Sequence, residues 1–233
     1  MRQIILDTET TGLEPEQGHR VVELAAVEYI NRRPTGNNFH KYLNPERDSD
    51  ERALEIHGLT TDFLRDKPSF AHISEEFIAY VGGAELIIHN ASFDLAFLNA
   101  ELARCNASSM ADICPQVIDT LKLAKDLHPG KRNNLNALCE RYEVDNSQRT
   151  LHGALLDAQL LGEVYLAMTR GQETLLMDIA PTAQTEARRA QSGKIKLQVV
   201  KANAEEVEAH QIFLDKMKKV SKGNCLWQQL ETL

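Results

Sequence analysis

The sequence predicts an α/β domain built on a mixed β-sheet. Its first part contains short β-branched runs, at Arg2–Leu6 and Arg20–Ile30, and a later part alternates such runs with helical patterns. Strands that precede a strand–helix alternation are typical of an α/β domain whose sheet holds both antiparallel and parallel pairs. With 233 residues, the chain is long enough for one such domain and a smaller segment.

The expected elements follow from the apolar periodicity and from the turn residues. A third strand is expected at Phe39–Leu43, and Pro34 and Gly36 predict a turn over 31–38 before it. Two further strands are expected at Glu85–Asn90 and Val117–Asp119. Helices are expected at Asp50–His57, after Thr60, and at Ser69–Val81, Phe93–Cys105, Thr120–Leu127, Leu135–Tyr142 and Gly153–Met168.

The character of the chain changes near Gln172. Residues 180–204 are rich in Ala, Gln, Thr and Arg and have little apolar periodicity, which predicts a mobile linker. Beyond it we expect a strand at Lys196–Val200 and a helix at Ala204–Val220, a tail too small to bury a core of its own. The expected organisation is a domain over 1–171, a flexible linker over 172–195 and a small docking tail over 196–233.

Composition limits the class of protein. The hydrophobic content of 42% and charged content of 26% are ordinary for a soluble globular protein. No apolar run reaches the ~20 residues that span a membrane, and the first residues lack the pattern of a secretory signal. The four cysteines form no C-x-x-C pair, which predicts reduced thiols in a cytoplasmic protein. A net charge of −8 argues against coating nucleic acid through a general basic surface, but not against an enzyme that admits one strand end.

Asp7 and Glu9 follow directly on the first apolar run, in the stretch DTETTG. Residues two apart in a strand share a face, so the two carboxylates are expected to point the same way. Carboxylates held so close repel each other unless a cation lies between them, and hard oxygen ligands suit Mg²⁺ or Mn²⁺. Solvated acids at a strand end are the alternative for this pair taken alone.

Three further residues complete a constellation. Asp94 lies in the first turn of a helix for which Ser92 is a suitable N-cap, a place where the helix dipole alone favours an acid. Asp157 lies in an apolar helical stretch, where it is ordinary only if it faces solvent. His152 precedes Asp157 by five residues, a spacing that leaves the two side chains ~140° apart on a regular helix. They meet only if His152 lies at or before the helix start, which Gly153 makes plausible.

Together these residues indicate a nuclease site. Four carboxylates around one cleft are what two divalent ions need, and two ions can clamp the attacking and leaving oxygens of a phosphoryl displacement. A neutral histidine close by supplies a base for the attacking water.

The sequence resembles the DEDDh family of 3′→5′ exonucleases. The resemblance is carried by DTETTG at 7–12, HNASFDLAFL at 89–98 and LHGALLDA at 151–158. It implies a ribonuclease H-like fold with a five-stranded mixed sheet flanked by helices, and two divalent ions, Mg²⁺ or Mn²⁺. The implied metal ligands are Asp7, Glu9, Asp94 and Asp157, and the implied general base is His152. The tyrosine subclass is disfavoured because Gly153 stands where its Tyr belongs.

Within the family, the chain is most similar to the proofreading exonucleases of bacterial replicative polymerases, which implies contacts with a 3′ DNA end. The stretch ALEIHGL at 53–59 is similar to the segment that contacts the terminal nucleotide. Arg52 stands where relatives carry an acid, and the adjacent Glu51 is an alternative contact. The implied substrate contacts are Asp7, Glu9, Glu51, His57, Asn90 and Asp157. For His89, Phe93 and Asp119, structural roles are favoured, the last as an N-cap.

The remainder of the chain predicts protein partners. Residues 172–177 resemble a short sliding-clamp-binding motif, with Gln172, Leu175 and Met177 as the docking side chains. The segment over 197–227 resembles a tail that binds the polymerase catalytic (alpha) subunit, and its apolar side chains lack a core of their own. A linker before it would hold the exonuclease near the primer end at high effective concentration. The resemblance also raises a small accessory (theta) subunit as a further partner.

The predicted function is therefore a metal-dependent 3′→5′ DNA exonuclease that proofreads as a subunit of a replicative polymerase, releasing nucleoside 5′-monophosphates. Two alternatives stay open. One is an RNA-trimming exonuclease of the same family, against which the docking tail argues. The other is a scaffold without catalysis that links clamp and polymerase, against which the complete set of acids and histidine argues.

Overall fold

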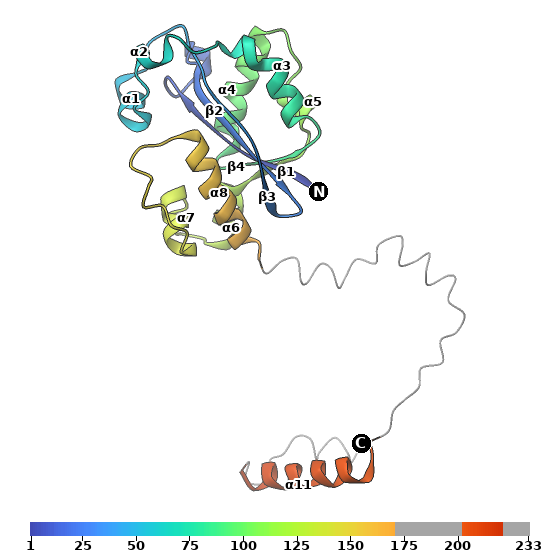
Figure 1. The fold of residues 1–233 in the computed structure, drawn as a ribbon. Helices are drawn as coiled ribbons and strands as arrows, with labels where there is room; N and C mark the ends of the chain where they lie inside the picture. The colour runs from blue at the N-terminus through green and yellow to red at the C-terminus, as the bar shows by residue number, and fades with distance from the viewer. Residues whose placement is uncertain (171–201, 221–233) are drawn as a thin grey trace, which may run out of the picture. The chain divides into compact units, whose positions relative to one another are not determined.

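The computed structural model describes residues 1–170 and 202–220. The first range folds around a five-stranded sheet of order β3-β2-β1-β4-β5, shown in Figure 1. The strands are β1 (Arg2–Thr10), β2 (Val21–Ile30), β3 (Arg33–Tyr42), β4 (Glu85–Ile88) and β5 (Val117–Asp119). The α-helices in this range are α1 (Glu51–His57), α2 (Thr61–Leu64), α3 (Phe70–Val81), α4 (Ala91–Arg104), α5 (Met110–Ile113), α6 (Thr120–Leu127), α7 (Leu135–Tyr142) and α8 (Ala154–Met168).

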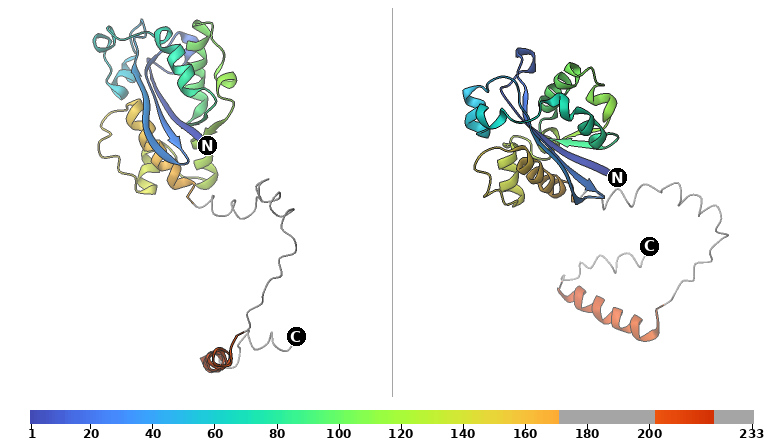
Figure 2. Two further views of the ribbon diagram at one scale, coloured as in Figure 1. Left: turned by 45° about the vertical axis from the view of Figure 1, so that its right-hand side comes forward. Right: turned by 45° about the horizontal axis from the view of Figure 1, so that its top comes forward.

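The sheet is mixed, as predicted. Strand β2 pairs antiparallel with both β1 and β3, whereas β4 pairs parallel with β1 and β5. Alternate side chains of β1 enter two separate cores: Ile4 and Leu6 pack with α3, α4 and α5, and Ile5 packs with α7 and α8. Figure 2 shows the two helical layers on opposite faces of the sheet. The central strand is therefore held from both faces and both edges.

The hairpin between β2 and β3 corrects one prediction. The expected turn over 31–38 is wrong, because only Asn31 and Arg32 form the turn, with φ of 51° and 64°. Two consecutive left-handed residues are typical of a type I′ hairpin, whose twist matches that of the flanking strands. Strand β3 then begins at Arg33 and includes Pro34, paired with Tyr29. A strand tolerates proline there because β3 is at the sheet edge.

Strand β1 is longer than its apolar run. The sequence predicts an end at Leu6, but pairing with β2 continues through Asp7↔Ala25 and Glu9↔Glu23 to Thr10. Backbone pairing supplies these hydrogen bonds whatever the side chain, so hydrophobicity alone misses the extension. The two acids thus lie inside a strand, three residues and one residue from its end, and a register shift follows Glu9.

Helix α4 begins earlier than predicted. Its N-cap is Asn90, in the left-handed region at φ 67°, and not Ser92. Asparagine is among the residues that adopt this conformation most readily, which lets the chain turn directly from β4 into the helix. Helix α5 was not predicted; the other helices and strands lie within a few residues of the expected bounds.

The second described range contains helix α11 (Ala204–Val220), as predicted. The expected strand at Lys196–Val200, the clamp-binding segment 172–177 and Trp227 lie outside the described residues, and the boundaries of the three segments stay predictions. Within the two described ranges, no helix is long and apolar enough to cross a membrane.

Candidate active site

Strand β1 supplies the first two acids. Asp7 and Glu9 share the face of Ile5, which is the face that α8 covers. Glu9 is buried, with 8% of its surface exposed, and Asp7 is partly buried. Because β1 is the central strand, both carboxylates are fixed by sheet pairing and helix packing at once.

Asp94 reaches the same place from the other layer. It lies in the first turn of α4, directly after the parallel strand β4, and is 3% exposed. The Thr8 hydroxyl donates a hydrogen bond of 2.7 Å to its Oδ1. The strand–helix junction therefore brings a third carboxylate to the end of β1, as predicted.

The start of α8 brings in Asp157 and His152. Gly153 is the N-cap, with an extended backbone, so Asp157 lies in the first helical turn and His152 lies outside the helix. The His152 backbone N–H donates to the carbonyl of Ile56, which fixes the turn. This break removes the ~140° separation of a regular helix and confirms that His152 lies before the helix start.

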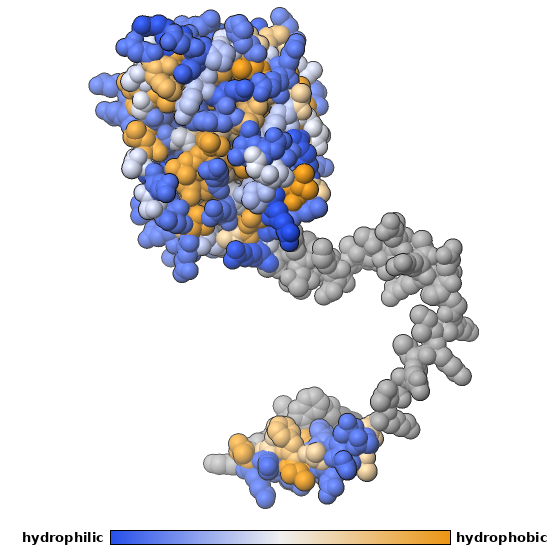
Figure 3. All heavy atoms as spheres, viewed as in Figure 1, coloured by the Kyte–Doolittle hydropathy of each residue, from blue (hydrophilic) through white to orange (hydrophobic). Residues whose placement is uncertain are grey.

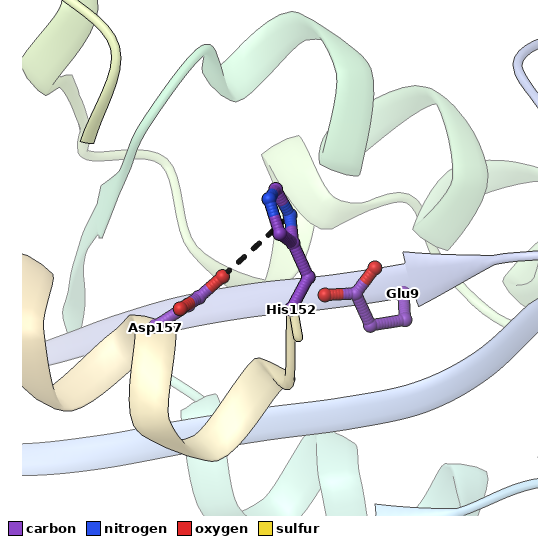
Figure 4. Close-up of side chains that lie close together, drawn as sticks. All are labelled: Glu9, His152 and Asp157. Atoms are coloured by element: carbon purple, nitrogen blue, oxygen red, sulfur yellow. Dashed lines mark ion pairs between the residues drawn. The ribbon is translucent and has the colours of Figure 1, made fainter. Parts of the chain in front are cut away.

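Figure 4 shows Glu9, His152 and Asp157 pointing to one place from three segments. One ligand atom of each lies within 4.8 Å of the others. The distance from His152 Nδ1 to Asp157 Oδ2 is 3.9 Å. All four acids and His152 line one cavity of about 310 Å³. The structure therefore brings the five predicted residues together.

Burial and mutual repulsion raise the pKa values of three of the four acids. Burial, followed by the charge of Asp94 and its acidic neighbours, raises the pKa of Asp7 well above its ordinary value. Burial and the charge of Asp157 raise the pKa of Glu9 to about 8, and burial raises the pKa of Asp94 to about 7. Burial, with Arg149 nearby, lowers the pKa of His152, so its imidazole is neutral near pH 7. A cation among the acids would relieve the repulsion.

The donor set fits a divalent metal. Carboxylate oxygens are the ligands that Mg²⁺ and Mn²⁺ prefer, and four acids and an imidazole line one small cavity. Buried carboxylates with raised pKa values are costly to keep ionised without such a charge. The cavity is therefore a candidate metal site.

Known proteins of similar sequence decide the family. Residues 4–165 match the family described as Exonuclease (RNase_T). The chain is 49% identical to the DNA polymerase III subunit epsilon of Escherichia coli (strain K12), over 97% of this chain and 97% of that protein. It is 47% identical to the subunit epsilon of Pasteurella multocida, over 98% and 94%. The chain belongs to the DNA polymerase III epsilon family.

A solved structure agrees with this epsilon-family fold. Exonuclease X, determined in complex with 5′-overhanging duplex DNA, is 27% identical, with a TM-score of 0.56 over 80% of this chain and 98% of that one. The predicted exonuclease family and ribonuclease H-like fold are thus confirmed. Epsilon-family proteins are proofreading 3′→5′ exonucleases that depend on divalent metal, and neither the RNA-trimming nor the non-catalytic alternative is favoured.

A second cavity of this epsilon-family chain adjoins the first. It has a volume of about 470 Å³, and both cavities are lined by Thr8, Glu9 and Phe93. Its far side is formed by α1 and includes Glu51, Arg52, Ala53, Ile56 and His57. The lining is mostly apolar with a few polar groups, which suits a sugar and base next to a metal-bound phosphate.

His57 lines that second cavity. Its Nδ1 accepts a hydrogen bond from the Leu59 backbone N–H at 2.9 Å, which places the ring proton on Nε2. This buried Nε2 has no well-formed hydrogen bond within the described residues. Burial lowers the pKa of His57, so the ring is neutral. The ring interacts only weakly with the Thr10 backbone, and a buried donor so poorly partnered is a reason to expect a ligand there.

The other predicted residues are placed differently. Asn90 lines neither cavity, and its backbone N–H donates to Asp119 Oδ1, so its substrate contact stays a prediction. Asp119 caps α6, as favoured, by accepting from the Leu121 and Lys122 N–H groups. His89 lines the 310 Å³ cavity, and its Nδ1 bonds to the Thr120 hydroxyl, which agrees with a structural role.

Two functional neighbours were not among the predicted site residues. Glu23, 2% exposed, faces Glu9 across the sheet and accepts from the Ala154 N–H at the start of α8 and from His40 Nε2. Its signal was a glutamate inside an apolar strand. Arg149 contacts Asp157 through two hydrogen bonds. Its signal was a basic residue three positions before His152, just ahead of the DEDDh-like stretch 151–158.

Proposed function

We propose that this chain excises mispaired 3′-terminal nucleotides from DNA as the proofreading subunit of DNA polymerase III. Two divalent ions, Mg²⁺ or Mn²⁺, are held by Asp7, Glu9, Asp94 and Asp157. When bound, such ions supply the charge that stabilises a phosphoryl displacement. The observation that carries the proposal is the convergence of four acids and one histidine on a single cavity.

His152 is the general base in this proposal. Its side chain is half-exposed, and its neutral imidazole is available to accept a proton from the attacking water. The backbone bond to Ile56 and the N-cap at Gly153 hold the ring at the cavity edge. A nucleoside 5′-monophosphate then leaves.

The second cavity is proposed to receive the terminal nucleoside. His57 Nε2 donates to it, and Glu51 and Arg52 both border it, so either can face the sugar or base. A mispaired end reaches the cavity more readily because unpairing costs less there. Phe93 borders both cavities and packs against Phe97, with ring centroids 5.0 Å apart.

One assay tests this catalytic proposal. Purified full-length chain is given a 3′-mismatched primer–template, the matched duplex or single-stranded RNA, with and without Mg²⁺. We expect metal-dependent release of deoxynucleoside monophosphates, fastest from the mismatched end. Absence of metal-dependent release would contradict the enzyme assignment, and a strong preference for RNA would replace proofreading with RNA trimming.

The polymerase contact is proposed to lie in the tail. Helix α11 exposes apolar side chains, seen in orange in Figure 3, among them Val207, Ile212 and Phe213. Exposed apolar residues on one short helix fit a partner surface such as the polymerase catalytic (alpha) subunit. Clamp binding by Gln172, Leu175 and Met177, and a theta subunit on the catalytic domain, are proposed from the resemblance alone.

A matched pair of variants tests the tail. Phe213→Ser is expected to weaken binding to the alpha subunit by about tenfold or more, since a buried aromatic anchor contributes on the order of 2 kcal/mol. Glu208→Ser, on the same exposed helix, is the control. Exonuclease activity should be unchanged in both. Equal alpha binding by both variants and by a chain truncated after 171 would contradict the assignment.

A further inference from the structure

Arg149 holds the one catalytic acid that lies on α8. Its Nε and Nη2 donate to the two carboxylate oxygens of Asp157, at 2.5 Å and 2.7 Å, and its Nη1 donates to Asn136 at 2.8 Å. Both side chains are buried, with 7% and 5% exposed. A two-bonded, buried arginine–carboxylate pair is the strongest form of this contact.

The pair lies in a cluster with an excess of negative charge. Arg149 is the one Arg or Lys side chain that lines the 310 Å³ cavity, within the part of the chain that the structure describes. Asp7, Glu9 and Asp94 line the same cavity. Among the described residues that line this cavity, Arg149 is therefore the permanent positive charge that compensates these acids.

The guanidinium and a metal ion make opposing demands on Asp157. A divalent ion binds a carboxylate oxygen at ~2.0–2.6 Å, which would bring it close to the guanidinium already bound to that carboxylate. Two cations so near each other in a buried site repel strongly. Arg149 lies in the segment between α7 and α8, outside regular secondary structure, so no helix or strand fixes its backbone.

We propose that Arg149 is an exchangeable counter-ion of the acid cluster, which a divalent metal displaces from Asp157 on binding. The negative charge of the cluster is then compensated either by the Arg149 guanidinium or by the metal, because the two cations do not bind Asp157 at the same time. This inference rests on the proposed metal site and adds a residue that sets the metal affinity. The competing role is a fixed support that orients Asp157 for the metal, and it predicts the opposite effect of mutation.

Metal binding, measured directly, separates the two roles. Mn²⁺ is titrated into full-length wild type, Arg149→Gln and Arg149→Lys, and free Mn²⁺ is followed by electron paramagnetic resonance in the absence of DNA. We expect Arg149→Gln to bind Mn²⁺ about tenfold more tightly, and Arg149→Lys to gain by a smaller factor because the charge is kept without the two-bonded contact. An oriented-support role instead predicts weaker binding in both variants.

A second arginine provides the control. Arg20, whose side chain is 14% exposed, makes a similar two-bonded contact with the buried Glu101, at 2.7 Å and 2.9 Å, away from the cavity. Arg20→Gln should therefore leave Mn²⁺ affinity unchanged. Melting curves add a second readout: Mg²⁺ should raise the melting temperature of Arg149→Gln more than that of wild type.

Unchanged or weaker Mn²⁺ binding in Arg149→Gln and Arg149→Lys overturns the exchange. If Arg149→Gln does not fold without metal, Arg149→Lys decides alone. Tighter Mn²⁺ binding than in wild type supports the exchange, and equal or weaker binding overturns it. Failure of the wild type to bind Mn²⁺ overturns the proposed metal site itself, which is thereby distinguished from failure of the exchange.

Discussion

Two buried arginine–carboxylate pairs of the same geometry serve different ends in this domain. Arg20 binds Glu101 with two hydrogen bonds, and the Val21 N–H adds a third contact to that carboxylate. Arg149 binds Asp157 equally well, but among further acids. The buried charges of the first pair are balanced one to one, since the further acid near Arg20, Glu46 at 3.6 Å, is solvent-exposed, and the pair joins the start of β2 to α4. The second leaves negative charge uncompensated, and that excess is what marks a site for cations.

The largest expected effect comes from removing one of the acids that line the cavity with Arg149. Asp7→Asn keeps the shape of the side chain but removes a metal-ligating charge, so we expect excision to fall by about 10⁴-fold. Since Asp7 is repelled by its neighbours, the metal-free variant should melt no lower than wild type. Nucleotide release and melting curves check both. Residual activity within tenfold of wild type would contradict the assignment of Asp7 as a metal ligand.

Loss of the base is expected to be next in size. His152→Ala should lower the turnover rate at saturating DNA by about 10³-fold, within the range for general bases. Because its pKa is lowered by burial and by Arg149, the wild-type rate should rise with pH through a value below the ordinary 6.5. A pH–rate profile measures this. An acid limb above 6.5 would contradict the assigned environment.

The balanced pair should matter for folding and not for chemistry. Arg20→Gln leaves the buried Glu101 without its counter-charge, so the free energy of unfolding should fall by about 3 kcal/mol. Urea denaturation in the presence of Mg²⁺ measures it. Excision per folded molecule should stay as in wild type. A loss of activity in parallel with Asp7→Asn would show that the two pairs are not separate.

A smaller, graded effect concerns pH without metal. The folded-state pKa values of Glu9 and Asp94 rise from 4.5 and 3.8 to about 8 and about 7. Between these limits the folded chain binds more protons than the unfolded one, so stability falls as pH rises. With a chelator, the melting temperature should therefore decrease from pH 5 to pH 8. Saturating Mg²⁺ should remove most of this slope, and an unchanged slope would count against metal binding by these acids.

The sequence by itself determined the residues and the order of most elements. The strands at Val117–Asp119 and near 85–90, the helices over 120–127, 135–142 and 204–220, and the five site residues follow from local patterns. Local signals suffice there because strand ends, N-caps and apolar periodicity act over a few residues. Local signals fail for the C-terminal part of β1, whose polar residues are held in the sheet by pairing with β2.

Tertiary structure alone decided which charges face each other. Glu23 comes opposite Glu9 through sheet register, and Arg149 meets Asp157 because the chain leaves regular structure just before α8. The second cavity likewise forms only where α1 comes next to β1. Sequence patterns carry short-range preferences, whereas burial and Coulomb interactions depend on distances that only the folded chain sets. The acids could be named in advance, but their counter-ion could not.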